Sequence, residues 1–548
     1  MKVNRREAAA LLIAGTLATR QRASADGGSK TFLHGVASGD PVADSVVLWT
    51  RIEPEDGAAA APFTWQVAST PDFVDIVAEG RGETTAERDF TVKAVPRSLA
   101  PGRQYFFRFE ARGEFSPVGR TRTLPRGKTP RLGIALASCS NYAFGYFNAY
   151  RAIAEDPAID WVLHTGDYIY EYGALGWGAE TARRLGRVHE PIREIVSLAD
   201  YRERHAQYKR DPDSQAMHAA HPLLCCWDDH ESTNNPWVGG AQNHQPSEGP
   251  WEERRDAAIQ AYFEWMPIRD ADSPAARRDF WRTYRFGDLA TLITLETRHT
   301  ARAEQIGYTE AARTIETVVD AERFKAEVIG APGRRMLSDG MERDLRRGLR
   351  ESVESGQPWR LLGNASPMAR MLVPDLSSVL KPDSDGASLR PDLAWKAKFN
   401  MPFYTDTWDG YPWARERLYD LCRAAGAEDL VVLTGDSHSF WANHLRDERG
   451  RAMGVELGTA GITSPGDFVE SGYERETAAA LDRAFEAGLD EVRWTDNLYQ
   501  GYVRISLRAE RADVDYVAVE TVLEPTPATR VLRSERLERR GSTVTYAD

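Results

Sequence analysis

Apolar segments of strand length alternate with helical stretches after Pro130, and this alternation constrains the fold more than any other feature of the chain. It is typical of a layered α/β domain. Polar side chains follow five of these segments, and the candidates among them include Cys139, Asp167, Asp229, Asn364 and Asp436. Because ligand sites in open α/β sheets gather beyond the carboxyl ends of strands, we expect these side chains to lie at one edge of the sheet.

The five segments are short apolar runs, which we predict to be buried strands. They span residues 132–137, 161–164, 222–227, 359–362 and 430–433. A single Asp behind a strand is usually a helix cap or a turn residue. Five such ends with metal-binding side chains are hard to treat as independent accidents, so we interpret them as parts of one site.

The donor atoms at these ends are of two kinds. Thiolate, phenolate and imidazole groups, available from Cys139, Tyr170 and His438, favour a transition metal. Carboxylate and amide oxygens favour a hard cation such as Ca²⁺ or Mg²⁺. The mixture predicts two different ions side by side, an arrangement that can clamp a phosphoryl group and lower the pKa of a bound water.

Several short motifs resemble the signatures of calcineurin-like metallophosphoesterases, close to the purple acid phosphatases. They are Gly166-Asp167-x-x-Tyr170, the Asp-Asp-His-Glu block at 228–231 and Gly-Asp-Ser-His at 435–438. Further segments resemble the alkaline phosphatase D (PhoD) family in particular, and they lie at 35–41, 137–140, 227–231, 264–267, 408–412, 457–459 and 463–466. Together these motifs cover nearly the whole chain in order.

The resemblance implies an α/β fold in which two packed sheets are flanked by helices (αββα), and a centre of Fe³⁺ beside Ca²⁺. Carried over by motif, the ligands of Fe³⁺ are Cys139, Asp167, Tyr170 and His438. Asp167 also bridges to Ca²⁺, whose remaining ligands are Asp229, Asn364 and Asp436. Relative to the purple acid phosphatases, oxygen donors replace imidazoles on one side, as a harder ion requires.

His230 and Asn235 are the residues we expect to contact substrate. His230 follows a proposed ligand and is expected to donate to the phosphate or to the leaving oxygen; the alternative is a histidine that only orients Asp229. Asn235 is expected to reach a phosphate oxygen or a further Ca²⁺, although a capping role explains it equally well. The implied mechanism is attack by a metal-bound hydroxide without a covalent phosphoenzyme.

Short alternating strands, such as those at 45–50, 63–67 and 105–109, precede the α/β part of the chain. They predict an antiparallel β-sandwich at residues 31–125. The Leu99–Gly102 segment followed by Tyr105 resembles the tyrosine corner of fibronectin type III domains. A linker rich in Pro and Gly follows, so we predict a second, catalytic domain at 131–548.

Residues 1–25 have the layout of a twin-arginine export signal. Arg5 and Arg6 precede a short apolar stretch, and Ala23-Ser24-Ala25 offers a cleavage site. We therefore expect export by the twin-arginine translocase to the periplasm or the exterior. The apolar stretch is too short to span a bilayer, so no transmembrane segment is predicted.

The composition excludes several classes of protein. Of 548 residues, 42% are hydrophobic, and 69 Lys+Arg against 82 Asp+Glu give a net charge of −13, which argues against a nucleic-acid-binding protein. Four cysteines form no disulfide framework. Cys225 and Cys226 lie in an apolar strand and are expected to be buried free thiols. Arg254 and Arg255 lie on a helical stretch, where a solvated face is expected.

These features predict an exported, metal-dependent alkaline phosphatase that hydrolyses small phosphate esters. A phosphodiesterase that acts on phospholipid or teichoic-acid-like polymers with the same centre stays open as an alternative. A serine hydrolase is disfavoured because G-x-S-x-G is absent from the sequence, and phospholipase D chemistry is excluded because H-x-K-x₄-D is absent too. A non-enzymatic adhesion or sugar-binding protein would leave the five decorated strand ends unexplained.

Overall fold

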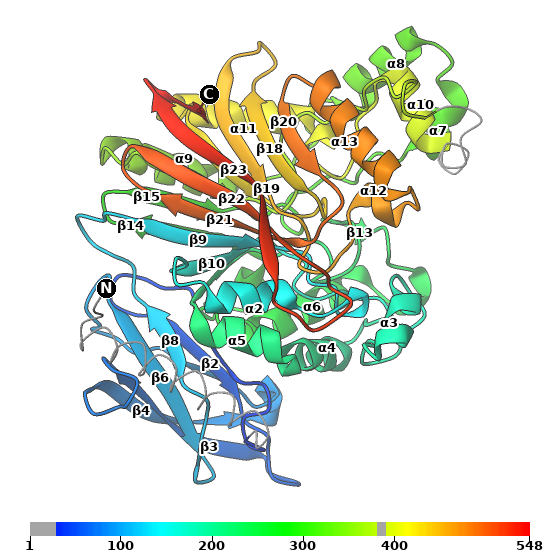
Figure 1. Cartoon of the computed structure of the whole chain (residues 1–548). Coiled ribbons are helices and arrows are strands. Elements are labelled where there is room, and N and C mark those ends of the chain that lie inside the picture. Colours follow the sequence, from blue (N-terminus) through cyan, green and yellow to red (C-terminus); the bar gives the residue numbers. More distant parts are fainter. Residues whose placement is uncertain (1–28, 381–390, 548) are drawn as a thin grey trace, which may run out of the picture.

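The computed structural model describes residues 29–380 and 391–547, and its centre consists of two β-sheets packed face to face (Figure 1). Among the described residues the larger sheet has ten strands, in the order β24 (Thr543–Tyr546), β23 (Thr529–Arg540), β22 (Arg511–Val519), β21 (Gly501–Leu507), β9 (Leu132–Ala137), β10 (Trp161–His164), β11 (Leu223–Cys225), β1 (Val36–Gly39), β2 (Val47–Arg51) and β5 (Thr91–Ala94). The smaller sheet has seven strands among the described residues. Their order is β14 (Arg282–Phe286), β15 (Ala290–Thr294), β16 (Trp359–Gly363), β17 (Leu430–Thr434), β19 (Ala452–Gly458), β18 (Phe440–Arg446) and β20 (Val492–Asp496). The export signal predicted at residues 1–25 lies outside the described residues.

The central strands form because both of their faces are buried. Along β9, alternate residues from Leu132 to Leu136 point into the core between the sheets, whereas Ala135 and Ala137 face the helices. Full burial of each Leu or Ile stabilises the fold by roughly 1.5–3 kcal/mol. β9 and β10 coincide with the predicted strands, and their parallel pairing places their carboxyl ends side by side.

Helices cover the outer face of each sheet. On the larger sheet lie α2 (Asn148–Glu155), α4 (Leu198–Arg210), α5 (Pro212–Ala220) and α6 (Trp251–Trp265). On the smaller sheet lie α9 (Asp339–Glu354) and α11 (Pro412–Ala425). The remaining α-helices are α3 (Ala179–Leu185), α7 (Tyr308–Thr314), α8 (Val318–Phe324), α10 (Pro391–Phe399), α12 (Asp467–Glu470) and α13 (Arg475–Gly488). Within residues 29–380 and 391–547, no helix combines the length and the apolar character that crossing a membrane requires.

Local sequence determines where these helices begin and end. At the start of α5, the Asp211 carboxylate accepts the backbone N–H groups of Asp213 (2.9 Å) and Ser214 (3.2 Å), and Pro212 occupies the first turn. At the end of α11, Gly426 has a left-handed backbone with φ of 72°, a conformation that favours glycine.

The N-terminal region consists mainly of β-strands, some of which belong to the larger sheet while the others form a second sheet packed against them (Figure 1). A separate antiparallel sheet consists of β3 (Ala60–Ala68), β4 (Ile76–Thr85), β6 (Gln104–Ala111), β7 (Glu114–Phe115) and β8 (Gly119–Arg122). The backbone N–H of Ala100 donates to Tyr105 Oη at 2.9 Å, which forms the predicted corner. β1, β2 and β5 lie opposite this sheet but continue the ten-stranded sheet, because β1 pairs in parallel with β11. The predicted fold class is confirmed, and the division into domains at 31–125 and 131–548 stays a prediction.

Candidate metal centre

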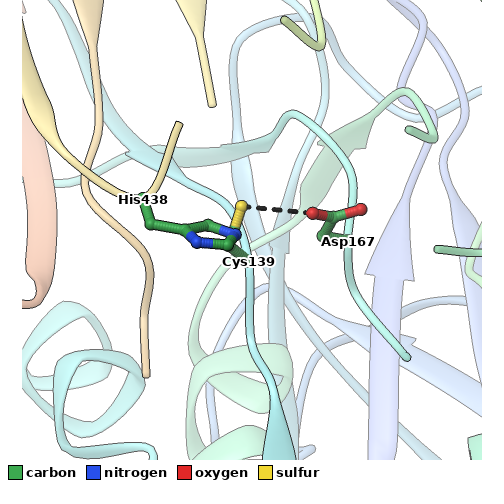
Figure 2. Close-up of side chains that lie close together, drawn as sticks. All are labelled: Cys139, Asp167 and His438. Atoms are coloured by element: carbon green, nitrogen blue, oxygen red, sulfur yellow. Dashed lines mark hydrogen bonds between the residues drawn. The ribbon is translucent and has the colours of Figure 1, made fainter. Parts of the chain in front are cut away.

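The carboxyl ends of several central strands meet at one place, where the side chains of Cys139, Asp167 and His438 point toward one another (Figure 2). Their ligand atoms all lie within 4.8 Å of one another. All three residues have left-handed backbones, with φ of 58°, 56° and 55°. Each such residue costs about 1–3 kcal/mol, and such conformations concentrate at functional sites. The turns behind the strands therefore hold the side chains inward at the expense of stability.

These three residues and Tyr170 form a group of donors that we call the thiolate half. The Cys139 thiol donates to Asp167 Oδ2 at 3.3 Å, and the Tyr170 hydroxyl donates to the same oxygen at 3.2 Å. Tyr170 Oη also lies 3.5 Å from His438 Nε2 and 2.9 Å from Ser464 Oγ. The structure thus brings together all four residues predicted to bind the first ion.

A second group, which we call the carboxylate half, consists of Asp228, Asp229 and Asp436. Their ligand oxygens also lie within 4.8 Å of one another. Asp167, Asp229 and His230 form a third group of the same size, which connects the two halves. Within the described part of the chain, the buried Oδ1 of Asp229 has no hydrogen-bond partner. Asp228 was not among the predicted ligands, although it lies in the motif that suggested Asp229.

The electrostatics of the thiolate half favour occupation by a cation. Burial and the neighbouring Asp167 carboxylate raise the pKa of Cys139 and of Tyr170 well above their usual ranges. Burial also raises the pKa of Asp167 well above its usual range. In contrast, burial lowers the pKa of His438 to about 3, which keeps its imidazole neutral, as a metal ligand must be. A bound cation would favour the anionic forms of the other three donors, so the donors present fit a metal.

Close approach of the loops depends on one glycine and one glutamate. Gly166 has φ of 102°, and a Cβ atom there would lie 2.3 Å from the backbone nitrogen of Asp228. The buried Glu231 carboxylate accepts the backbone N–H groups of Asp167 (3.0 Å), Tyr168 (2.6 Å) and Asp228 (2.8 Å). Glu231 therefore ties the loop after β10 to the loop after β11.

His230 lies between the two halves and is anchored by Glu171. Its Nδ1 lies 2.6 Å from Glu171 Oε2, and its ring packs on that of Tyr170 with centroids 4.3 Å apart. Glu171 is fully buried and also accepts the backbone N–H of Asn234 at 2.8 Å. Burial acts to lower the pKa of His230, but the carboxylates of Asp229, Glu171 and Asp167 outweigh it and raise this pKa well above its usual value.

Two predicted residues have other partners in the structure. The Asn364 amide donates to Ser366 O at 2.6 Å, and its Oδ1 accepts from Trp408 Nε1 at 3.3 Å. The backbone N–H of Asn235 donates to Asp229 Oδ2 at 2.8 Å, whereas its side-chain amide donates to Gln242 at 2.7 Å. The ligand role of Asn364 and the substrate contact of Asn235 therefore stay predictions.

Arg298 is a residue of the centre that the sequence analysis missed. It follows β15, which is therefore a sixth strand with a polar end. The Glu296–His299 segment carried the same signal as the other five strand ends.

The solvated face expected for Arg254 and Arg255 is wrong, since both are buried. Arg254 pairs with Glu248 (3.0 Å), which lies just before α6, and with Glu194 (2.8 Å), which comes from a distant loop.

The remaining cysteine prediction is confirmed. Cys225 and Cys226 are buried, and neither forms a disulfide bond with any described residue. Cys225 belongs to β11, where its side chain packs with the apolar residues under the helices.

An aromatic and apolar rim borders the centre. The Trp177 indole stacks on the His438 ring, with centroids 5.5 Å apart and planes at 19°, and its Nε1 donates to Glu470 at 2.7 Å. Leu175 lies two residues earlier and is 88% exposed. Ile192, 73% exposed, accepts the backbone N–H of Ala174 at 2.8 Å. The loop beside His438 therefore presents apolar side chains to solvent.

Comparisons with known proteins give a consistent result. A family model described as PhoD-like phosphatase matches residues 134–516, and one described as PhoD-like phosphatase, N-terminal domain, matches residues 17–125. Alkaline phosphatase D of Bacillus subtilis (strain 168) is 33% identical over 514 residues, which cover 91% of this chain and 79% of that protein. A solved structure described as that of PhoD superposes with a TM-score of 0.75 at 30% identity, covering 95% of this chain and 92% of the other.

Proposed function

The chain belongs to the PhoD-like phosphatase family and is a phosphoesterase, and from this premise we propose that it hydrolyses small phosphate esters with a centre of Fe³⁺ beside Ca²⁺. One observation carries the proposal: two groups of donors with different chemistry adjoin each other through Asp167 and Asp229. A single-metal site would need only one such group.

The donor sets support the identity of the two ions. In the thiolate half, Cys139, Asp167 and Tyr170 offer three anionic donors beside a neutral imidazole, which suits trivalent iron. The carboxylate half offers oxygens alone, as Ca²⁺ prefers. We assign Asn364 to this half as a further oxygen donor on the strength of its motif. Bound there, the two cations would supply a water of lowered pKa and neutralise charge on the phosphoryl group.

The residues around the centre support direct attack by water. Glu171 holds Nδ1 of His230, which leaves Nε2 to donate a proton to the leaving oxygen. Asn235 is proposed to contact a phosphate oxygen, supported by its backbone bond to Asp229. The neighbouring serine hydroxyls are engaged elsewhere: Ser140 donates to Tyr168 O at 2.9 Å, and Ser464 contacts Tyr170 at 2.9 Å. They are not placed as activated nucleophiles.

Metal exchange tests the proposed function. Chelation of Ca²⁺ should abolish hydrolysis of a monoester while iron stays bound, since only Asp167 is shared between the proposed sites. Activity should return with Ca²⁺ and return less with Mg²⁺, which demands a tighter octahedral shell. Metal content is measured alongside by elemental analysis. Full recovery with Zn²⁺ alone in iron-free protein would show that the ions are misassigned.

The exposed rim favours a second candidate, a phosphodiesterase that acts on esters with an apolar part, such as phospholipids. Leu175 lies between Tyr172 and Trp177, whose rings pack against those of His230 and His438. Leu175→Ser should lower kcat/KM for a diester with apolar substituents and leave that for a small monoester unchanged. Val74→Ser is the matched control, because Val74 is 84% exposed in the N-terminal region. Equal effects on both substrates would remove this candidate.

We also propose export through the twin-arginine translocase, on the strength of residues 1–25. Replacement of Arg5 and Arg6 by lysine should retain the protein in the cytoplasm of a host with this translocase. Cell fractionation measures the result, and unchanged release would contradict the proposal.

A further inference from the structure

Arg298 is a fully buried arginine that lies against the carboxylate half. Its Nε donates to Asp228 Oδ1 at 2.5 Å, and its Nη2 lies 4.0 Å from Asp229 Oδ1 and 3.8 Å from Asp436 Oδ2. Among the residues that the structure describes, neither Nη1 nor Nη2 has a hydrogen-bond partner. Buried polar groups are nearly always hydrogen-bonded, so this guanidinium is an exception that needs a reason.

The loop after β15 holds Arg298 in this position. The buried Glu296 carboxylate accepts the backbone N–H groups of Arg298 (2.8 Å) and His299 (2.7 Å), and it also accepts Trp227 Nε1 at 3.1 Å. The guanidinium is therefore fixed at a distance too long for hydrogen bonds to Asp229 and Asp436, yet short enough for strong electrostatic attraction. Because arginine does not lose its proton in proteins, the charge is permanent.

A count of charges gives the reason for this placement. With cations bound and every donor ionised, three carboxylates and one guanidinium would leave the carboxylate half with two net negative charges, whereas Cys139, Asp167 and Tyr170 of the thiolate half would carry three. We propose that Arg298 sets the charge of the carboxylate half and thereby makes it prefer a divalent over a trivalent cation. The inference rests on the proposed function, in that it takes these carboxylates to hold a cation.

The test compares the binding of Tb³⁺ and Ca²⁺ to iron-loaded, calcium-depleted full-length protein. Tb³⁺ luminescence, excited through nearby aromatic residues, reports trivalent binding, and titration with Ca²⁺ gives the ratio of the two affinities. Arg298→Gln removes the guanidinium charge and should raise the preference for Tb³⁺ on the order of tenfold. Arg298→Lys should keep the wild-type ratio. Arg415→Gln is the control, because Arg415 is also buried but pairs with Asp409 at 2.7 Å.

A charge-restoring pair keeps the test decisive if the single variant folds poorly. Asp228→Asn alone should lower the preference for Tb³⁺, and Asp228→Asn combined with Arg298→Gln should return it to the wild-type value. The proposal is overturned if the preference for Tb³⁺ is not highest in Arg298→Gln, lowest in Asp228→Asn and equal to wild type in the double variant. If it is unchanged while inorganic phosphate binds more weakly, Arg298 is a phosphate ligand instead. If the wild-type protein binds neither Ca²⁺ nor Tb³⁺, the proposed function itself fails.

Discussion

The two halves of the centre are built on different principles. In the thiolate half, four chemically distinct side chains touch one another directly, with Asp167 Oδ2 3.3 Å from Cys139 and 3.2 Å from Tyr170. In the carboxylate half, three like side chains repel one another, and Arg298 offsets part of that repulsion. Donor identity therefore defines the first half, whereas net charge defines the second. Substitutions that keep charge but change chemistry should damage the two halves unequally.

The largest expected effect comes from the thiolate itself. Cys139→Ser replaces a soft thiolate with a poorly acidic hydroxyl, so iron content should fall steeply and activity by more than the roughly 100-fold loss seen for residues that only support a ligand. Elemental analysis and kcat measure these changes. Cys225→Ser is the control, since this buried thiol lies in β11 away from the donors. Full iron and full turnover in Cys139→Ser would remove donor identity as the basis of this half.

The next effect tests whether His230 serves the two halves jointly. His230→Gln should lower kcat by about 100-fold for esters with poor leaving groups, because general acid catalysis is lost. Esters with good leaving groups should suffer less. Glu171→Gln should cause the same pattern at about tenfold, since it weakens the anchor of Nδ1. A loss that is independent of the leaving group would assign His230 to metal binding alone.

A spectroscopic effect follows from Tyr170. If the phenolate binds Fe³⁺, the resting protein should be coloured by a charge-transfer band, and Tyr170→Phe should shift or weaken this band while the ring keeps its packing on His230. The visible absorption spectrum measures the change, and Tyr172→Phe is the control on the same loop. An unchanged band in Tyr170→Phe would leave Cys139 as the source of any colour.

The smallest expected effect concerns Lys209, a buried amine of α4 that lies over the ring of Tyr168. Lys209 Nζ lies 2.7 Å from His218 Nε2, and burial lowers its pKa well below the usual 10.5. The unfolded chain keeps this proton up to pH 10.5, so the free energy of unfolding should rise with pH by about 1.4 kcal/mol per unit toward that value. Lys209→Met should remove this dependence on pH, and its gain in the free energy of unfolding over the wild-type protein should be largest at the lowest pH.

Urea denaturation at pH 7, 8 and 9 measures how the free energy of unfolding of the wild-type protein and of Lys209→Met changes with pH. Lys398→Met, at an exposed position of α10, is the control and should follow the wild-type protein. An identical slope in Lys209→Met would mean that this amine keeps its proton in the folded state.

The same difference between the halves explains what could be predicted from the sequence. Cys139, Tyr170 and His438 are rare donors at ends of apolar strands, so local pattern and motif sufficed to group them. The polar end of β15 carried the same local signal, but the role of Arg298 depends on which loops approach each other. Asp228 was missed because carboxylates behind strands are too common to distinguish locally. The strands at 132–137 and 161–164 were predicted because burial on both faces leaves continuous apolar runs. The sheet partners of β1 and the burial of Arg254 depend on distant segments and were beyond such patterns.

The pairing of β9 with β21 has a consequence for synthesis of the chain. β9 leads directly to Cys139, yet one of its two neighbours in the sheet consists of residues Gly501–Leu507. A ribosome must therefore add more than three hundred and fifty further residues after Leu136 before Val503 can pair with it. Contacts so distant in sequence form slowly. The larger sheet is completed only near the end of translation. A nascent chain released before β21 would therefore lack the strand that pairs with β9, which leads into the turn that carries Cys139.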